Sequence, residues 1–263
     1  MKIAYIGIDL FLPALVSLHK CGCEIAEIFT CETDNVTEFN TEITAFAVSH
    51  NIPYTTSRIS REDIKRLKAS GVEAAVCGGY YYRIPVDKEL PMVNIHPSLL
   101  PMGRGSWPMP VCILRGEKRS GVTVHKIAEG FDTGDMLLQR AFDVADDENL
   151  ETFMEKASRI ASELMVELAA NFSELYKNAL PQGEGEYISA PQETDWTVDS
   201  DMSFEDADRI LRAFYGYECV FRAGDKKYTM IGAKAVSGEN QNERFRIKDG
   251  YILPGKIYCE TTV

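Results

Sequence analysis

Short apolar runs alternate with helical patterns along the first 77 residues, and this alternation limits the fold more than any other feature of the sequence. The strand-like runs, rich in apolar and β-branched residues, are 2–8, 23–30, 53–55 and 72–77. Helix-like apolar spacing separates them at 10–19, 37–49 and 60–70. This order predicts an α/β fold, a doubly wound, Rossmann-like and mostly parallel sheet with helices on both faces. Such sheets bind ligands at the carboxyl ends of their strands.

The first predicted strand is not followed by a nucleotide-binding loop. No Gly-x-Gly-x-x-Gly pattern follows residues 2–8, and the chain has no Walker-type sequence. The interpretation as a dehydrogenase-like nucleotide-binding protein therefore lacks its main support.

An asparagine and a histidine end the next strand-like run. Asn94 and His96 are two residues apart, and Pro97 stops the run. Alternation along a strand puts both side chains on one face. An amide donor beside an imidazole is suited to holding an oxyanion and managing a proton. A strand end with satisfied side chains is the ordinary alternative.

A carboxylate follows in a tight Phe-Asp-Thr-Gly turn. Asp132 lies in this turn, between strand-like runs at 122–127 and 135–144. A carboxylate beside an imidazole fixes its tautomer, raises its pKa or takes a proton through water. Asp-Thr-Gly alone is a common turn, but its combination with Asn-x-His is more specific than either part.

The run Asn-Ile-His-Pro-Ser-Leu-Leu-Pro at 94–101, followed by Asp132, resembles the signature of formyltransferases that use 10-formyltetrahydrofolate. This family includes methionyl-tRNA formyltransferase, glycinamide ribonucleotide formyltransferase and the sugar N-formyltransferases. The resemblance extends from the first strand to about residue 180, and more weakly into the C-terminal part. It implies that Asn94, His96 and Asp132 are the catalytic residues.

The resemblance also implies residues that bind the formyl donor. The Gly-Gly-Tyr-Tyr-Tyr-Arg-Ile-Pro loop at 78–85 matches one that lines the pterin pocket largely through backbone groups. The implied donor-binding residues are Arg83, Ile84, Ser98, Gly130 and Phe131. An ordinary turn with aromatics packed on the sheet is the alternative for this loop, and three successive tyrosines are not expected all to face the core.

On the acceptor side, Arg104 and Gly105 match an Arg-Gly of the family and are implied acceptor-loop residues. A plain transition from loop to helix, capped by Ser106, is the alternative. His125 stands where the purine-pathway enzymes carry a histidine, so it is a candidate to support the catalytic residues. A satisfied strand histidine is equally consistent with the sequence.

The C-terminal third predicts a smaller β-rich, barrel-like domain. Thr152 and Glu155 form a capping-box pattern for a helix to about residue 176. We expect a catalytic domain at 1–180, a linker at 181–194 and a small domain at 195–263 that resembles a truncated formyltransferase C-terminal domain. A helix is predicted at 204–215. Short strands follow at 219–222, 228–233, 244–247 and 251–253, with the last strands of the barrel expected to be truncated or missing.

Charge bears on the acceptor. The formal net charge is −12, and nucleic-acid binding rests heavily on Lys and Arg. The segment 30–39, where methionyl-tRNA formyltransferases carry a basic insertion, contains neither residue type. We therefore expect an N-formyltransferase that acts on a small amine such as an amino sugar, without a metal. The alternatives are a methionyl-tRNA formyltransferase and a catalytically silent folate-binding protein.

The cellular setting follows from what the sequence lacks. No run approaches the roughly 20 apolar residues of a membrane helix, and residues 2–8 read directly as a strand, without a signal-peptide pattern. The seven cysteines show no zinc or redox spacing, which indicates reduced structural thiols. A cytoplasmic protein is expected, with His19 and His50 as surface or cap residues near helix ends.

Overall fold

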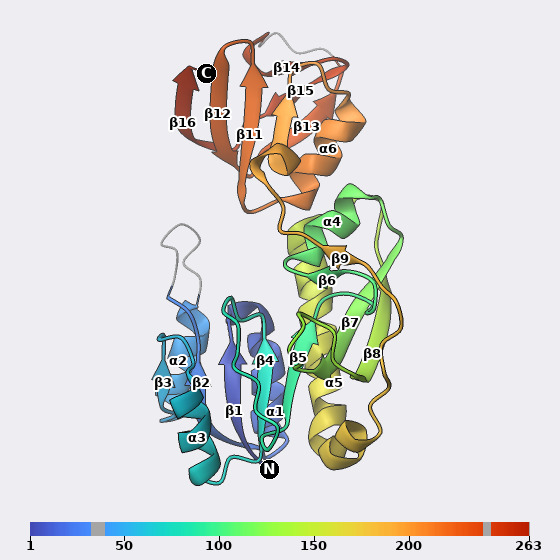
Figure 1. The fold of residues 1–263 in the computed structure, drawn as a ribbon. Coiled ribbons are helices and arrows are strands. Elements are labelled where there is room, and N and C mark those ends of the chain that lie inside the picture. The colour runs from blue at the N-terminus through green and yellow to red at the C-terminus, as the bar shows by residue number, and fades with distance from the viewer. Residues whose placement is uncertain (33–39, 239–242, 263) are drawn as a thin grey trace. The chain divides into compact units, whose positions relative to one another are not determined.

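The computed structural model describes residues 1–32, 40–238 and 243–262. The chain divides into two compact units (Figure 1). Unit 1 comprises 1–104, 121–142 and 155–187, and unit 2 comprises 105–120, 143–154 and 188–263. Within the described residues, no helix is both long and apolar enough to cross a membrane.

A seven-stranded sheet, in the order β3-β2-β1-β4-β5-β7-β8, forms the centre of unit 1. Its strands are β1 (Lys2–Gly7), β2 (Glu24–Phe29), β3 (Tyr54–Thr55), β4 (Ala74–Gly78), β5 (Met92–His96), β7 (Arg119–Lys126) and β8 (Met136–Asp143). The pairs formed by β1 to β5 are parallel, whereas β5 and β7 are antiparallel. This mostly parallel sheet confirms the predicted fold class.

Three short helices connect the first strands, and a longer one follows β8. They are α1 (Leu12–Lys20), α2 (Thr41–Ser49), α3 (Arg61–Ala69) and α5 (Leu150–Lys177). Ser60 begins α3 with a capping box to Asp63. The helix predicted at 37–49 is observed from Thr41, and residues 37–39 lie outside the described part. Likewise, most of the segment at 30–39, which contains no Lys or Arg, lies outside the described residues.

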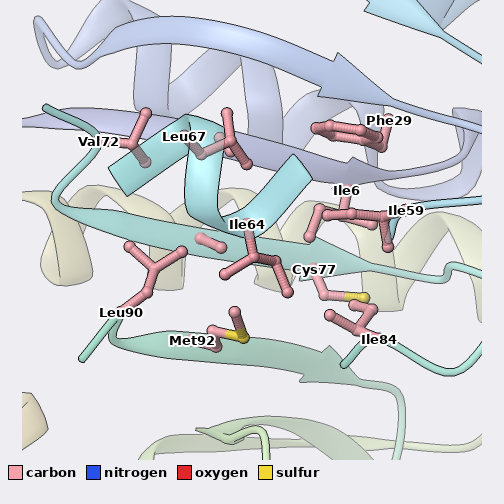
Figure 2. Packing of buried hydrophobic residues seen from close by; sticks show 12 residues of the cluster. Ile6, Phe29, Ile59, Ile64, Leu67, Val72, Cys77, Ile84, Leu90 and Met92 are labelled. Atoms are coloured by element: carbon pink, nitrogen blue, oxygen red, sulfur yellow. The ribbon is translucent and has the colours of Figure 1, made fainter. Parts of the chain in front are cut away.

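The hydrophobic core lies on both faces of this sheet. On one face, Ile64 and Leu67 of α3 cover Ile6, Cys77 and Met92 of the strands (Figure 2). Alternation turns Tyr5 to the opposite face, where its hydroxyl donates to the backbone oxygen of Phe11 over 2.9 Å. Apolar burial on two faces explains why these strands read as nearly continuous apolar runs.

Unit 2 is richer in β-structure than the sequence predicted. Its strands are β10 (Thr197–Asp199), β11 (Glu218–Ala223), β12 (Lys226–Ile231), β13 (Lys234–Ser237), β14 (Arg246–Ile247), β15 (Gly250–Leu253) and β16 (Lys256–Thr262). They form sheets in the orders β10-β11-β12-β16 and β13-β15-β14. The last strand, β16, pairs with β12 over most of its length, and the shortening expected relative to the C-terminal domain of the family stays a prediction.

Two helices complete unit 2, α4 (Pro108–Leu114) and α6 (Phe204–Ala213). They pack against each other, and Trp107 lies edge-on to Phe214 and Tyr217, with ring centroids 5.6 and 4.9 Å apart. Ser203 caps α6 by accepting from the amide of Asp206.

Candidate active site

Two neighbouring strands position the polar side chains of the site. Asn94 and His96 lie at the carboxyl end of β5, where Asn94 is opposite His125 and His96 is opposite Thr123 of the antiparallel β7. His96, Thr123 and His125 are buried, and Asn94 is half-buried. The period of two along each strand therefore gathers these side chains on one face.

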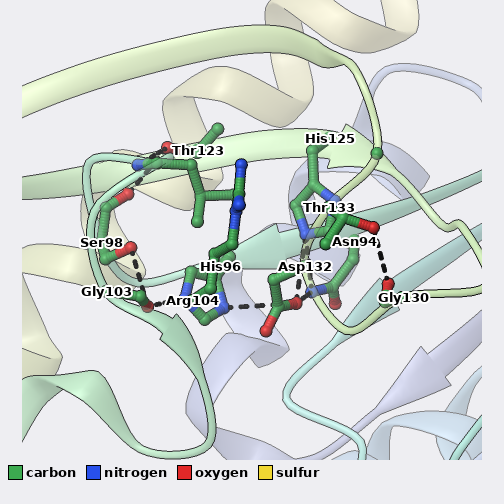
Figure 3. A network of polar contacts seen from close by, with 12 residues as sticks. Asn94, His96, Ser98, Gly103, Arg104, Thr123, His125, Gly130, Asp132 and Thr133 are labelled. Carbon is green, nitrogen blue, oxygen red and sulfur yellow. Dashed lines mark hydrogen bonds and ion pairs between the residues drawn. The ribbon is translucent and has the colours of Figure 1, made fainter. Parts of the chain in front are cut away.

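Asp132 brings the cluster together (Figure 3). Its carboxylate Oδ1 lies 3.3 Å from Asn94 Nδ2, 3.6 Å from His96 Nδ1 and 3.4 Å from His125 Nε2. The residue precedes β8 and has φ 53°, in the left-handed region. Few residues other than glycine, asparagine and aspartate adopt this conformation readily.

The hydrogen bonds fix one tautomer of His125 and the orientation of the Asn94 amide. His125 Nδ1 lies 2.8 Å from the backbone oxygen of Lys126 and must donate to it. In the neutral ring, Nε2 then accepts from Asn94 Nδ2 over 3.1 Å. The other hydrogen of Nδ2 faces Asp132, so both amide hydrogens of Asn94 are used. Asn94 must therefore give up one of these bonds to donate to anything else.

His96 is held through one ring nitrogen. Nε2 donates to the backbone oxygen of Gly103 over 2.7 Å, which turns Nδ1 toward Asp132. Burial lowers the pKa of His96 below its ordinary value, and the charge of Asp132 and the Gly103 carbonyl only partly oppose this effect. Asp132 acts in the expected direction by raising the pKa of His96, but burial has the larger effect and lowers it.

A second group of bonds holds the loop that follows His96. The hydroxyl of Ser98 donates to the backbone oxygen of Met102 over 2.8 Å. Thr123 Oγ1 donates to the Ser98 backbone oxygen over 2.7 Å and accepts from Gln139 Nε2 over 2.9 Å. The hydroxyl of Ser98, expected to contact the formyl donor, is thus used within the loop.

The side chain of Arg104, at the end of the same loop, reaches the segment that follows α5. Its Nε donates to Gln182 Oε1 and its Nη2 to the backbone oxygen of Gly183, each over 2.9 Å. Gly105 has φ 102°, a conformation that favours glycine. Ser106 does not cap the following helix, because Trp107 occupies the N-cap position with φ 59° and makes no side-chain cap bond.

The predicted donor-binding residues divide between core and surface. Ile84 is buried in the core cluster of Figure 2, so its side chain is used in packing. Arg83 donates to the backbone oxygen of Glu129 over 2.7 Å and lies 5.7 Å from the ring centroid of Phe131, which is 57% exposed. Gly130 accepts from Thr133 Oγ1 over 3.1 Å in the turn that presents Phe131.

The loop at 78–85 carries two exposed aromatic rings. Tyr81 and Tyr82 are exposed, whereas Tyr80 is half-buried and accepts from the amide of Ile59 over 3.1 Å. This confirms that the three tyrosines do not all face the core.

Sequence reasoning missed three residues that support this site. Thr123 and Gln139 brace the loop after His96, and Gln182 binds the loop of Asp132. Each acts through a contact between residues distant in sequence, which no local pattern reveals. Within the described residues, no group of three or more His, Cys, Asp or Glu side chains has a metal-binding arrangement.

Comparison with known proteins gives a consistent family. The sequence model of the family described as formyl transferase matches residues 23–169. Methionyl-tRNA formyltransferase of Ehrlichia ruminantium (strain Welgevonden) is 32% identical over 72% of this chain and 62% of its own length.

Two solved structures share the fold. An N-formyltransferase from Helicobacter canadensis, in complex with folinic acid and dTDP-3-aminofucose, has a TM-score of 0.70 at 19% identity, covering 98% of this chain and all of that one. A sugar N-formyltransferase from a Shewanella species has a TM-score of 0.66 at 17% identity, covering 91% of this chain and 98% of that one.

The chain spans about three fifths of the length of the first curated relatives it matches. The matched family model nevertheless covers more than half of the chain, and the chain therefore belongs to the formyl transferase family.

Proposed function

We propose that the chain transfers a formyl group from 10-formyltetrahydrofolate to an acceptor amine. The observation that carries this proposal is the convergence of Asn94, His96 and Asp132 at the carboxyl end of β5. It combines an amide donor, an imidazole and a carboxylate within reach of one reacting centre. The catalytic domain is proposed at 1–180, with a small domain at 195–263 and a connection at 181–194.

The chemistry moves one proton and exchanges one C–N bond for another. The acceptor amine attacks the formyl carbon, and Asn94 Nδ2 donates to the oxyanion after releasing Asp132 or His125. His96 Nδ1, unprotonated in the neutral ring, accepts the proton of the attacking amine, and Asp132 stabilises the imidazolium. The bond to N10 of the folate then breaks, and His96 returns the proton to N10.

We assign the donor to the surface formed by Arg83, Gly130 and Phe131, together with the backbone of Ile84. The exposed ring of Phe131 offers an apolar face, and Arg83 offers a cation beside it. The Helicobacter enzyme of similar fold was solved with folinic acid. Ser98 is assigned to hold the loop beside the donor, since its hydroxyl already has a partner there.

A small amine, such as an amino sugar, is the proposed acceptor, with Arg104 and Gly105 beside it and His125 supporting Asn94. The acidic balance of −12 favours this acceptor over a polyanion. The two solved structures described above match nearly along their whole chains; one is a sugar N-formyltransferase and the other an N-formyltransferase in complex with dTDP-3-aminofucose.

Methionyl-tRNA is the second candidate acceptor, and two observations favour it. The curated relatives are methionyl-tRNA formyltransferases. Residues 218–263 also carry eight Lys and Arg against six Asp and Glu, in contrast to the acidic remainder. A locally basic region is what a nucleic-acid acceptor requires.

Release of tetrahydrofolate from 10-formyltetrahydrofolate, measured with a panel of acceptors, tests both. The panel contains nucleotide-linked amino sugars, glycinamide ribonucleotide and methionyl-tRNA. We expect turnover with an amino sugar that Asp132→Asn abolishes. Turnover with methionyl-tRNA alone would make methionyl-tRNA the preferred acceptor in place of an amino sugar. Folate binding without turnover on any acceptor would favour a catalytically silent folate-binding protein.

A further inference from the structure

The segment 180–187, which we name the strap, follows α5 and lies along two loops of the site. Leu180 exchanges two backbone hydrogen bonds of 2.8 Å with Met136, at the start of β8. Farther along, the backbone oxygen of Glu186 accepts from the amide of Arg104 over 3.0 Å. The strap is therefore paired at both ends, although the sequence predicts a linker here.

Gln182, half-buried in the middle of the strap, uses both ends of its amide. Nε2 donates to the backbone oxygens of Asp132 and Gly134 over 2.9 and 2.7 Å. Oε1 accepts from Arg104 Nε over 2.9 Å. Two carbonyls need a donor and a guanidinium needs an acceptor, so these partners fix the orientation of the amide.

The bond to Asp132 acts on a residue with an uncommon backbone conformation. A positive φ is uncommon outside glycine, and although aspartate adopts it more readily than most residues, its surroundings help to hold it. Gln182 holds the carbonyl oxygens on both sides of Thr133, which fixes the peptide groups that follow Asp132. The carboxylate in turn sits 3.3 to 3.6 Å from three nitrogens, so a small backbone displacement would change all three contacts.

We propose that Gln182 is a positioning residue, which sets the places of Asp132 and Arg104 relative to each other in the formyl-transfer site. The inference rests on the proposed function for its kinetic consequence. The partners of the Gln182 amide are the backbone oxygens of Asp132 and Gly134 and the guanidinium of Arg104, not the catalytic side chains Asn94 and His96 or the Asp132 carboxylate. Gln182 acts by joining the loop that carries the carboxylate to the loop that carries Arg104, so the catalytic and acceptor sides move together.

Gln182→Met tests this, because it preserves length and removes all three hydrogen bonds. We expect kcat to fall roughly tenfold to a hundredfold, as a displaced catalytic group requires, with a smaller change in KM for the folate. Gln182→Glu is the second variant, since it retains an acceptor for Arg104 and loses both donations. Gln192→Met is the matched control, because Gln192 is exposed and its side-chain partners are the backbone oxygens of Ala190 and Pro191 and, in a capping box, Asp195.

A readout without turnover separates positioning from folding. The chain has four histidines, so their ring signals can be followed by NMR during a pH titration. If Gln182 holds Asp132 in place, the titration of His96 shifts toward lower pH in Gln182→Met, since the carboxylate raises the pKa of His96. Gln192→Met should titrate as the wild type does.

A fall in Tm with unchanged kcat and unchanged His96 titration, in either Gln182 variant, would overturn the inference and leave Gln182 a structural role only. Absence of formyl transfer in the wild type would instead remove the proposed function. The NMR titration would still decide whether Gln182 positions Asp132.

Discussion

His96 faces Asp132 with Nδ1, which lies 3.6 Å from the carboxylate Oδ1. The other ring nitrogen donates to a backbone carbonyl, so in the neutral ring Nδ1 is the nitrogen that can take a proton. Most of the predictions below follow from this pair and the loop that carries Asp132.

Replacing Asp132 with asparagine should stop catalysis without disturbing the fold. Asparagine tolerates a positive φ, so the backbone is retained while the charge beside His96 is removed. We expect kcat to fall about 10²- to 10⁴-fold, measured as the initial rate of tetrahydrofolate release. Asp135→Asn is the control, because Asp135 pairs with Lys126 at the edge of the same loop. Equal losses in both variants would contradict the assignment.

His96 should titrate below the ordinary histidine pKa of about 6.5, because burial favours the neutral ring. Asp132→Asn should lower the midpoint further, since the carboxylate raises the pKa of His96. NMR titration of the ring signals measures both. A wild-type midpoint above 6.5 would show that desolvation is not the main influence, and an upward shift in the variant would show that the carboxylate does not raise the pKa of His96.

The same pKa shift makes stability depend on pH. A histidine whose pKa is lowered by folding binds its proton first in the unfolded state, so the free energy of unfolding decreases as pH falls through about 6.5 toward the folded pKa. The slope attributable to one group reaches at most about 1.4 kcal/mol per pH unit. Urea unfolding at several pH values should show a shallower dependence in His96→Gln, and identical slopes would exclude this contribution.

Substitution by alanine should affect stability differently at two glycines, Gly134 in the loop of Asp132 and Gly183 in the strap. A Cβ at Gly134 would lie 1.9 Å from the backbone oxygen of Lys126, whereas one at Gly183 meets nothing within 4 Å. Gly134→Ala should lower the free energy of unfolding by about 3 kcal/mol and reduce activity, because the loop of Asp132 must shift. Gly183→Ala should stay within about 0.5 kcal/mol of the wild type. Denaturant unfolding compares them, and equal stability would show that the loop can relax.

Thiol alkylation should divide the seven cysteines, all of which are free. Cys21 and Cys259 are exposed and should react within the native protein. Burial raises the pKa of Cys77 to about 12, and Cys112 and Cys219 share this property. These three should react only after unfolding, as mass spectrometry of the alkylated protein would show. Rapid native labelling of Cys77 would mean that the end of β4 opens readily.

The sequence predicted the local elements of unit 1 well. Strand and helix periods are local, so the pattern of β1 to β4 and of α1 to α3 could be recognised from short windows. Strand alternation and the family resemblance together indicated that Asn94, His96 and Asp132 would meet. The predicted start of α5 was wrong, because Asn149 rather than Thr152 caps this helix, with Asn149 Oδ1 accepting from the Thr152 amide over 2.9 Å.

What the sequence did not reveal depends on distant neighbours. The protonation of His96 follows from how deeply the fold buries it. Gln182 lies 50 residues from Asp132, in a stretch whose Pro and Gly content resembles a linker. The strands β13 and β16 went unrecognised because exposed residues in them leave little apolar pattern.

Each unit is assembled from three separate stretches of the chain. A ribosome delivers residues in order at about 5 to 20 per second, so the interval between residues 104 and 187 is on the order of ten seconds. During that time residues 105–120, the first stretch of unit 2, are made before the strands of residues 188–263 with which they form the unit. Asp132 is likewise made before Gln182. The site is therefore completed only once residue 182 has been made, and the last side chain to arrive among those described around it comes from the strap.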